Sequence, residues 1–161
     1  MAGRKKSKNL LTIVFIVLIL LSFAAIAIVN LINFDDYVTA DVLQVNGNTV
    51  IIGNKCTAIV SDTSAERALA IQEGIEGVME QRPNTWDIFA ETLRSFNVSL
   101  EYITIDNFKN ETYYANMYLK STTKVLKLDT KPSDAIALAL RTNSTIYINK
   151  TLLDEVGQNI C

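Results

Sequence analysis

The sequence contains no histidine and only two cysteines, Cys56 and Cys161, in its 161 residues. The absence of imidazole excludes a histidine general base, a serine–histidine triad and histidine-ligated zinc. Two cysteines are also too few for a disulfide framework. Because Cys161 is the last residue, where chains are often loose, the sequence favours two unpaired cysteines and leaves a disulfide between them open.

Charged residues, glycine and proline are all absent from residues 10–29, LLTIVFIVLILLSFAAIAIV. About 20 residues at about 1.5 Å each are just long enough to cross a hydrocarbon layer of about 30 Å. This run therefore predicts a transmembrane helix, whose bounds we set at residues 10–32. A buried core helix is the less favoured alternative.

The charges on either side of this run differ in sign. Four basic residues precede it and three acidic residues are the first charges after it: Arg4, Lys5, Lys6 and Lys8, then Asp35, Asp36 and Asp41. By the positive-inside rule, we predict a single-pass protein of the cell membrane, with a cytoplasmic tail at residues 1–9, a connector at 33–40 and an extracytoplasmic domain at 41–161. Cleavage as a signal peptide after the small residues at 25–27 is the alternative.

The part after the membrane run is acidic. All 17 acidic residues and 11 of the 15 basic residues follow it, which gives a formal charge of −6. A protein that holds nucleic acid mainly through phosphates needs a basic surface, so this balance disfavours such binding. Four lysines form the nearest approach to a basic patch: Lys120, Lys124, Lys127 and Lys131. Four glycosylation sequons weakly support an outside location: Asn97, Asn110, Asn143 and Asn149.

Along this part of the chain, short runs in which apolar and polar residues alternate are interspersed with segments whose apolar residues recur at helical spacing. They predict strands at residues 40–45, 49–52, 57–61, 100–105, 112–119, 124–128 and 145–149, and helices at 65–80, 86–95, from 132 onward and near 152–156. Asn46, Gly47 and Asn48 predict a hairpin turn, and residues 107–111 predict a second turn. Alternation in residues 124–128 predicts that Leu126 and Leu128 face the core while the lysines face outward. Because strands pair locally and helices are interspersed, the fold class is α+β, a mostly antiparallel sheet with packed helices.

The stretch TKPSDAIALALRTN, residues 130–143, predicts a buried helix. Pro132 suits its first turn, and Asp134 lies at the positive end of the helix dipole, where a carboxylate stabilises the helix without any chemistry. Asn143 can end the helix in the left-handed conformation. In the helix predicted at 65–80, Gly74 either weakens the helix or admits another element closely.

Three blocks of sequence resemble the bifunctional nuclease domain family. They are DTKPSDAIALALR (129–141) with IYI and LDE after it, Arg82-Pro83-x-Thr85-x-Asp87, and Asp106-x-x-Lys109-x-x-Thr112-Tyr113-Tyr114-Ala115. The resemblance implies an α+β domain, often found as a homo-oligomer, with activity on DNA and RNA attributed to some members. This chain has Trp86 where the family commonly has histidine, and Lys131 where it commonly has arginine.

Without histidine, a nuclease on this fold would use carboxylates to hold Mg²⁺ or Mn²⁺, which activates water and neutralises phosphoryl charge. Resemblance and chemistry together select three catalytic candidates, Asp134, Asp129 and Asp87, and three metal-ligand candidates, Asp134, Asp129 and Asp106. Arg82, Lys131 and Arg141 are the candidates for substrate phosphates. For each acid, a helix cap or a turn is the structural alternative; for Arg82 and Arg141 it is an internal salt bridge.

Two functions remain open from the sequence. The first is a membrane-anchored nuclease that hydrolyses DNA or RNA phosphodiesters with a divalent metal. The second is a non-catalytic ligand- or partner-binding module on the same fold, tethered to the membrane. The expected partners are membrane lipid through the N-terminal helix, nucleic acid for the first function, and further copies of the chain.

Overall fold

The structure is a computed structural model of the chain and describes residues 33–79 and 81–161. From Asp35 to Cys161 the chain forms one compact unit. The predicted transmembrane helix at residues 10–32 lies outside the described residues. Within the described ranges, no helix combines the length and the apolar character needed to cross a bilayer.

The order of elements agrees with the predicted α+β class. The strands are β1 (Tyr37–Asn46), β2 (Thr49–Asn54), β3 (Thr57–Asp62), β4 (Ser99–Lys109), β5 (Thr112–Lys120), β6 (Val125–Thr130), β7 (Thr145–Asn149) and β8 (Gln158–Asn159). The helices are α2 (Ala65–Glu76), α3 (Thr85–Ser95), α4 (Pro132–Thr142) and α5 (Lys150–Val156), with a short 3-10 turn, η2, at Phe34–Asp36.

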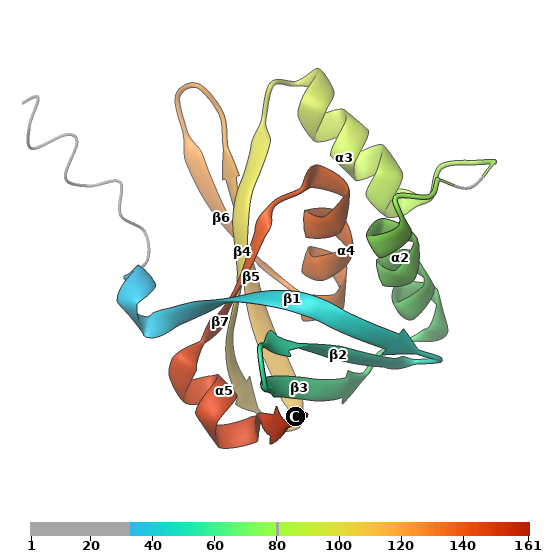
Figure 1. Cartoon of the computed structure of the whole chain (residues 1–161). Coiled ribbons are helices and arrows are strands. Elements are labelled where there is room, and N and C mark those ends of the chain that lie inside the picture. The colour runs from blue at the N-terminus through green and yellow to red at the C-terminus, as the bar shows by residue number, and fades with distance from the viewer. Residues whose placement is uncertain (1–32, 80) are drawn as a thin grey trace, which may run out of the picture. The chain divides into compact units, whose positions relative to one another are not determined.

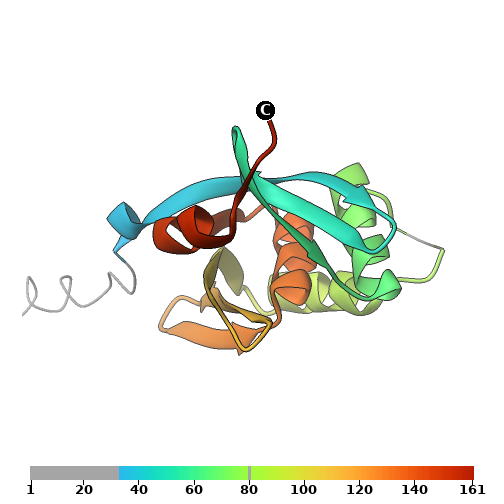
Figure 2. The same ribbon diagram turned by 90° about the horizontal axis from the view of Figure 1, so that it is seen from below.

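The strands of the described chain form one eight-stranded sheet in the order β6-β5-β4-β7-β1-β2-β3-β8 (Figure 1). Neighbouring strands in this part of the chain are antiparallel except β4 and β7, which run parallel. Figures 1 and 2 show α2, α3 and α4 together on one side of the sheet, while α5 lies apart from them. The helix α4 contacts α2, α3 and strands β4, β5 and β7, so it is the centre of the core.

The sequence of α4 explains this central place. Pro132 occupies its first turn, residues 135–139 are all buried, and Asn143 ends it in the left-handed conformation at φ 53°, as predicted. Gly74 of α2 lies so close that a Cβ at that position would be 2.9 Å from the Cβ of Leu140. Of the two alternatives that the sequence left open for Gly74, the close approach of another element is therefore present.

One helix end and one hairpin turn differ from the prediction. The helix α2 ends at Glu76, before the predicted residue 80, because Gly77 adopts the left-handed conformation at φ 65° and caps it. The turn predicted at residues 107–111 is only two residues long, since Asn110 and Glu111 both have positive φ, 49° and 57°, and let β4 and β5 pair up to Lys109 and Thr112.

Leu126 and Leu128 were predicted to face the core. They lie opposite the buried Leu119 and Met117 of β5, on the helix side of the sheet. Leu128 packs against the core, but Leu126 is 51% exposed because β6 is the edge strand. The prediction was therefore wrong for the burial of Leu126.

The two cysteines form a disulfide across a sequence separation of 105 residues. This corrects the preference for unpaired thiols. The C-terminus is held because the short strand β8, which the sequence did not predict, pairs with β3, and the Ile160 N–H donates to the Cys56 carbonyl at 2.9 Å.

Candidate functional site

Two stretches of sequence that lie far apart meet at a surface pocket of about 360 Å³. The lining residues come from three helices and two strands: Glu66 and Arg67 of α2, Thr85, Trp86 and Phe89 of α3, Asp134 and Leu138 of α4, Met117 of β5 and Thr130 of β6. We call this the Asp134 pocket. It unites residues of the block Arg82-Pro83-x-Thr85-x-Asp87 with residues of the block at 129–141.

Asp134 makes an ion pair in this pocket. Its Oδ1 accepts a hydrogen bond from Arg67 Nε at 2.8 Å, and the two side chains are 30% and 29% exposed. Arg67 also donates from Nη1 to the Oγ of Ser64, the N-cap of α2, at 3.1 Å. The N-cap of α4 is Lys131, which makes no side-chain cap hydrogen bond. Asp134 thus lies in the first turn of α4, where the dipole favours it, and also links α4 to α2.

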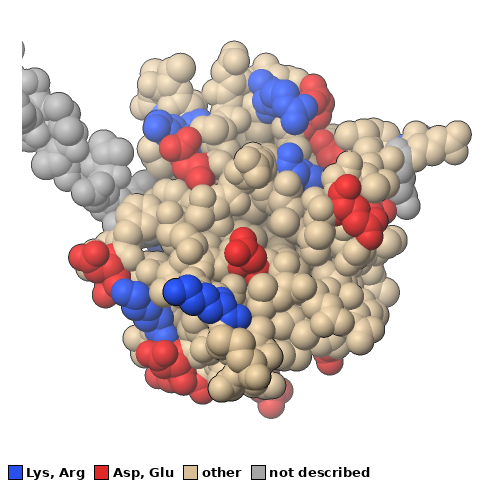
Figure 3. All heavy atoms as spheres, in the orientation of Figure 1, with Lys and Arg blue, Asp and Glu red and all other residues tan. Residues whose placement is uncertain are grey.

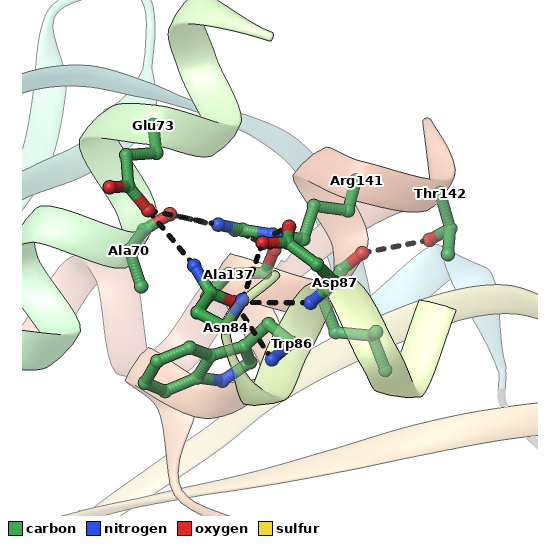
Figure 4. A network of polar contacts seen from close by, with 9 residues as sticks. Ala70, Glu73, Asn84, Trp86, Asp87, Ala137, Arg141 and Thr142 are labelled. Atoms are coloured by element: carbon green, nitrogen blue, oxygen red, sulfur yellow. Dashed lines mark hydrogen bonds and ion pairs between the residues drawn. The ribbon is translucent and has the colours of Figure 1, made fainter. Parts of the chain in front are cut away.

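Asp87 and Arg141, two further candidates, form an internal ion pair beneath α3 (Figure 4). Arg141 Nε donates to Asp87 Oδ1 at 2.5 Å, and the side chains are only 8% and 4% exposed. The Nη1 of Arg141 donates to the carbonyls of Ala70 at 2.7 Å and Ala137 at 2.9 Å. Arg141 therefore joins α2, α3 and α4.

Glu73 and Asn84 complete this network. Asn84 donates from Nδ2 to Glu73 Oε2 at 2.9 Å, and Glu73 lies 3.4 Å from Arg141 Nη2. Asn84 also caps α3, because its Oδ1 accepts from the Trp86 and Asp87 N–H groups while the Asp87 carboxylate accepts from the Asn84 N–H at 2.9 Å. Such a capping box fixes the start of α3 and so the position of Trp86 in the Asp134 pocket.

Asp106 and Asp129 lie on the opposite face of the sheet. Asp106 accepts hydrogen bonds from the Tyr37 hydroxyl at 2.7 Å and from the Asn116 amide. Asp129 is directly across from Asn116 in the β5–β6 pair, and residues directly opposite share a face. Burial, and next the hydrogen bond to Asp106, raise the pKa of Tyr37 well above its ordinary value. The structure therefore brings Asp106 and Asp129 to one side and leaves Asp134 on the other.

The remaining phosphate candidates are exposed. Arg82 lies in the connection between α2 and α3, and Lys131 lies at the start of α4, where it lines a different pocket from Asp134. On the face drawn in Figure 3, basic and acidic side chains are interspersed and make no continuous basic surface. No group of three or more Asp, Glu or Cys residues that could hold a metal ion occurs in residues 33–79 and 81–161.

Sequence reasoning missed Glu66 and Arg67. Both belong to the first turn of α2, directly after the cap Ser64, where the sequence pattern predicts only a helix. The sequence separation of 67 between Arg67 and Asp134 leaves no local pattern that predicts their contact. The single available signal is that an arginine in the first turn of a helix opposes the dipole, which suggests a specific partner.

Comparison with known proteins agrees with the three blocks. Residues 55–160 match the family model described as bifunctional nuclease domain. An uncharacterized protein of Mycobacterium tuberculosis (strain H37Rv) is 29% identical over 105 residues, which cover 65% of this chain and 61% of that protein. Bifunctional nuclease 1 of Oryza sativa subsp. japonica is 26% identical over 105 residues, which cover 63% of this chain and 31% of that protein. The chain thus spans less than two thirds of the length of these relatives.

Proposed function

Because the chain belongs to the bifunctional nuclease domain family, we propose that it hydrolyses phosphodiester bonds of DNA or RNA in the Asp134 pocket. The observation that carries the proposal is the pocket itself, which gathers Thr85, Thr130 and Asp134 from two of the family's blocks. A concave site with a few convergent polar groups over apolar walls is the usual form of a ligand site.

The donor set of this pocket suits a hard divalent cation. Asp134 and Glu66 supply carboxylate oxygens, and Mg²⁺ is commonly held by one or two carboxylates together with substrate phosphates. We propose that these two residues, rather than Asp106 and Asp129 on the other face, would hold Mg²⁺ or Mn²⁺. When bound, the ion supplies an activated water and neutralises charge on the phosphoryl oxygens.

The other residues of the pocket have roles in binding. Arg67 presents a guanidinium whose remaining N–H groups can donate to a phosphate while Nε stays on Asp134. Trp86 replaces the histidine common in the family and cannot act as a general acid or base, but its indole offers a face on which a base can stack. Lysine, tyrosine and cysteine are not among the lining residues of the Asp134 pocket, so proton transfer there falls to carboxylates and water.

We further propose that the domain acts outside the cytoplasmic membrane, anchored by residues 10–32, and self-associates there. The disulfide between Cys56 and Cys161 supports the outside location, because disulfides persist in oxidising compartments and are rare in the cytosol. It is independent of the charge asymmetry that motivated the topology.

The test uses the full-length protein in detergent with labelled single-stranded DNA and RNA, in Mg²⁺, Mn²⁺ or EDTA. We expect cleavage with metal and none in EDTA, and a loss of at least about 100-fold in Asp134→Asn. Asp154→Asn, which changes an exposed aspartate of α5, is the matched control and should keep the wild-type rate. Thermal melting of both variants separates lost chemistry from lost fold.

The second function, a non-catalytic binding module, is favoured by one observation. The Asp134 carboxylate is already paired with Arg67 at 2.8 Å, and the positive guanidinium beside it disfavours a metal cation on the same carboxylate. Wild-type protein that binds nucleic acid but leaves it uncut under all three conditions would establish this alternative.

A further inference from the structure

A second pocket, of about 530 Å³, lies on the other side of the first turn of α4. Its floor consists of buried aliphatic side chains from β2, β3, α2, β4 and α4: Val50, Ile52, Ile59, Ile71, Ile105 and Ile136. The volume falls within the range of about 300–1,000 Å³ typical of small-molecule sites.

Two aromatic rings stand at the mouth of this pocket. Phe108, which is 40% exposed, and Tyr113 have ring centroids 4.4 Å apart and planes inclined by 39°. They come from the paired ends of β4 and β5, which the short turn at Asn110 and Glu111 brings together. An exposed ring beside an apolar hollow is a surface on which a base can stack.

The cationic side of the mouth is Lys131, next to Ser133. Lys131 is exposed and, among the described residues, takes part in none of the ion pairs. Its ammonium is thus available to a phosphate. The exposed acids Asp62 and Glu111 also line the rim of this pocket, and their carboxylates can accept hydrogen bonds from the exocyclic amino groups of adenine, cytosine or guanine.

The first turn of α4 divides one sequence block between the two pockets. Thr130 and Asp134 line the Asp134 pocket, whereas Lys131, Pro132 and Ser133 line the second pocket. Lys131 and Asp134 are about one helical turn apart, roughly 5 Å along the axis. One nucleic-acid strand can therefore reach both pockets at once.

We propose that the second pocket is a subsite for one unstacked base of a single-stranded nucleic acid, with the adjoining phosphate on Lys131. The inference rests on the proposed function, since it places the neighbouring linkage at the Asp134 pocket. A base within a duplex cannot enter, so the subsite selects single strands. Its rim carboxylates favour bases with an exocyclic amino group over thymine and uracil.

The test measures fluorescence anisotropy of labelled 12-nucleotide strands with the full-length protein in detergent and EDTA, so that no cleavage is needed. We expect oligo-dA to bind more tightly than oligo-dT or a duplex. Phe108→Ala should weaken oligo-dA binding about fivefold or more, whereas Phe96→Ala, at an exposed ring outside the pocket, should not. Lys131→Ala should lower the slope of log K against log salt by about 0.7, and Lys124→Ala should leave it unchanged.

Absence of binding, equal binding of strand and duplex, or unchanged binding in both Phe108→Ala and Lys131→Ala overturns the subsite. If Phe108→Ala proves unfolded by melting, the salt slope of Lys131→Ala decides alone. Failure of the proposed function looks different, because the strand then binds in the second pocket but is never cut. If the wild-type protein cuts the strand but Phe108→Ala and Lys131→Ala bind it as the wild type does, the proposed function stands and the subsite is wrong.

Discussion

Arg141 of α4 donates from Nε to the carboxylate of Asp87 of α3 at 2.5 Å, with both side chains almost fully buried. The same guanidinium donates to the Ala70 carbonyl of α2. One residue thus fixes three helices, and those helices supply most of the side chains of the Asp134 pocket. The position of the site depends on a buried charge that lies outside it.

Removal of this charge should destabilise the fold strongly. Arg141→Ala leaves the buried Asp87 carboxylate without the Arg141 guanidinium, so we expect a loss of about 3–5 kcal/mol in the free energy of unfolding, measured by urea denaturation. Arg94→Ala, which removes the exposed pair with Glu91, should cost less than about 1 kcal/mol. Similar losses in the two variants would contradict a structural role for Arg141.

The disulfide should contribute to the same free energy. The double variant Cys56→Ser with Cys161→Ser releases the C-terminal strand from its covalent link, and we expect it to lose about 2–4 kcal/mol. Wild-type protein unfolded with a reducing agent should coincide with the double variant. An unfolding midpoint that does not respond to the reductant would show that the link is absent in solution.

Replacement of Gly74 by alanine tests the close approach of α2 and α4, because that approach decides whether stability rises or falls. In a free helix interior, Gly→Ala raises stability by about 0.5–1 kcal/mol. Here the added Cβ would lie 2.9 Å from the Leu140 Cβ and 3.1 Å from Arg141 Nη1, so Gly74→Ala should instead lower stability, by about 1–3 kcal/mol. A stabilised variant in thermal or urea unfolding would show that α2 and α4 lie further apart than described.

The pH dependence of stability should reveal Tyr37. Its pKa in the folded state is raised above the ordinary 10.0 by burial and by the hydrogen bond to Asp106. The stability that the neutral Tyr37 hydroxyl contributes is therefore complete below pH 10. It is lost as the pH rises from there toward the pKa of Tyr37 in the folded state, because Tyr37 ionises first in the unfolded chain. In Tyr37→Phe, urea midpoints should fall less between about pH 9 and 11 than in wild type. Tyr114→Phe, at an exposed tyrosine, is the control and should fall as wild type does.

The sequence predicted what local chemistry determines. Alternation, caps and turn residues gave the α+β class and the order of elements, and the left-handed end at Asn143 followed from its residue type. The sequence did not predict contacts between residues far apart in the chain that share no local pattern, such as Arg67 with Asp134 or Cys56 with Cys161. The two-residue strand β8 is too short to carry any periodicity.

The candidate site shows the same division. Family resemblance and metal chemistry together selected Asp134, Asp129 and Asp106 as one metal set, but the sheet separates Asp134 from the other two. Asp129 faces Asn116 on the side away from the helices, because neighbouring strand residues point to opposite faces and Thr130 lines the Asp134 pocket. The face of the sheet to which a residue points depends on the pairing register of its strand, which the sequence does not specify for an exposed edge strand.

The most direct measurement is the rate of metal-dependent cleavage of single-stranded DNA or RNA by two full-length variants, Asp134→Asn and Asp129→Asn, compared side by side. Our account predicts that folded Asp134→Asn loses at least about 100-fold, while Asp129→Asn, on the other face of the sheet, stays near the wild-type rate. A larger loss of rate in Asp129→Asn than in Asp134→Asn, or a wild-type protein that cuts neither substrate, would contradict the placement of the chemistry in the Asp134 pocket.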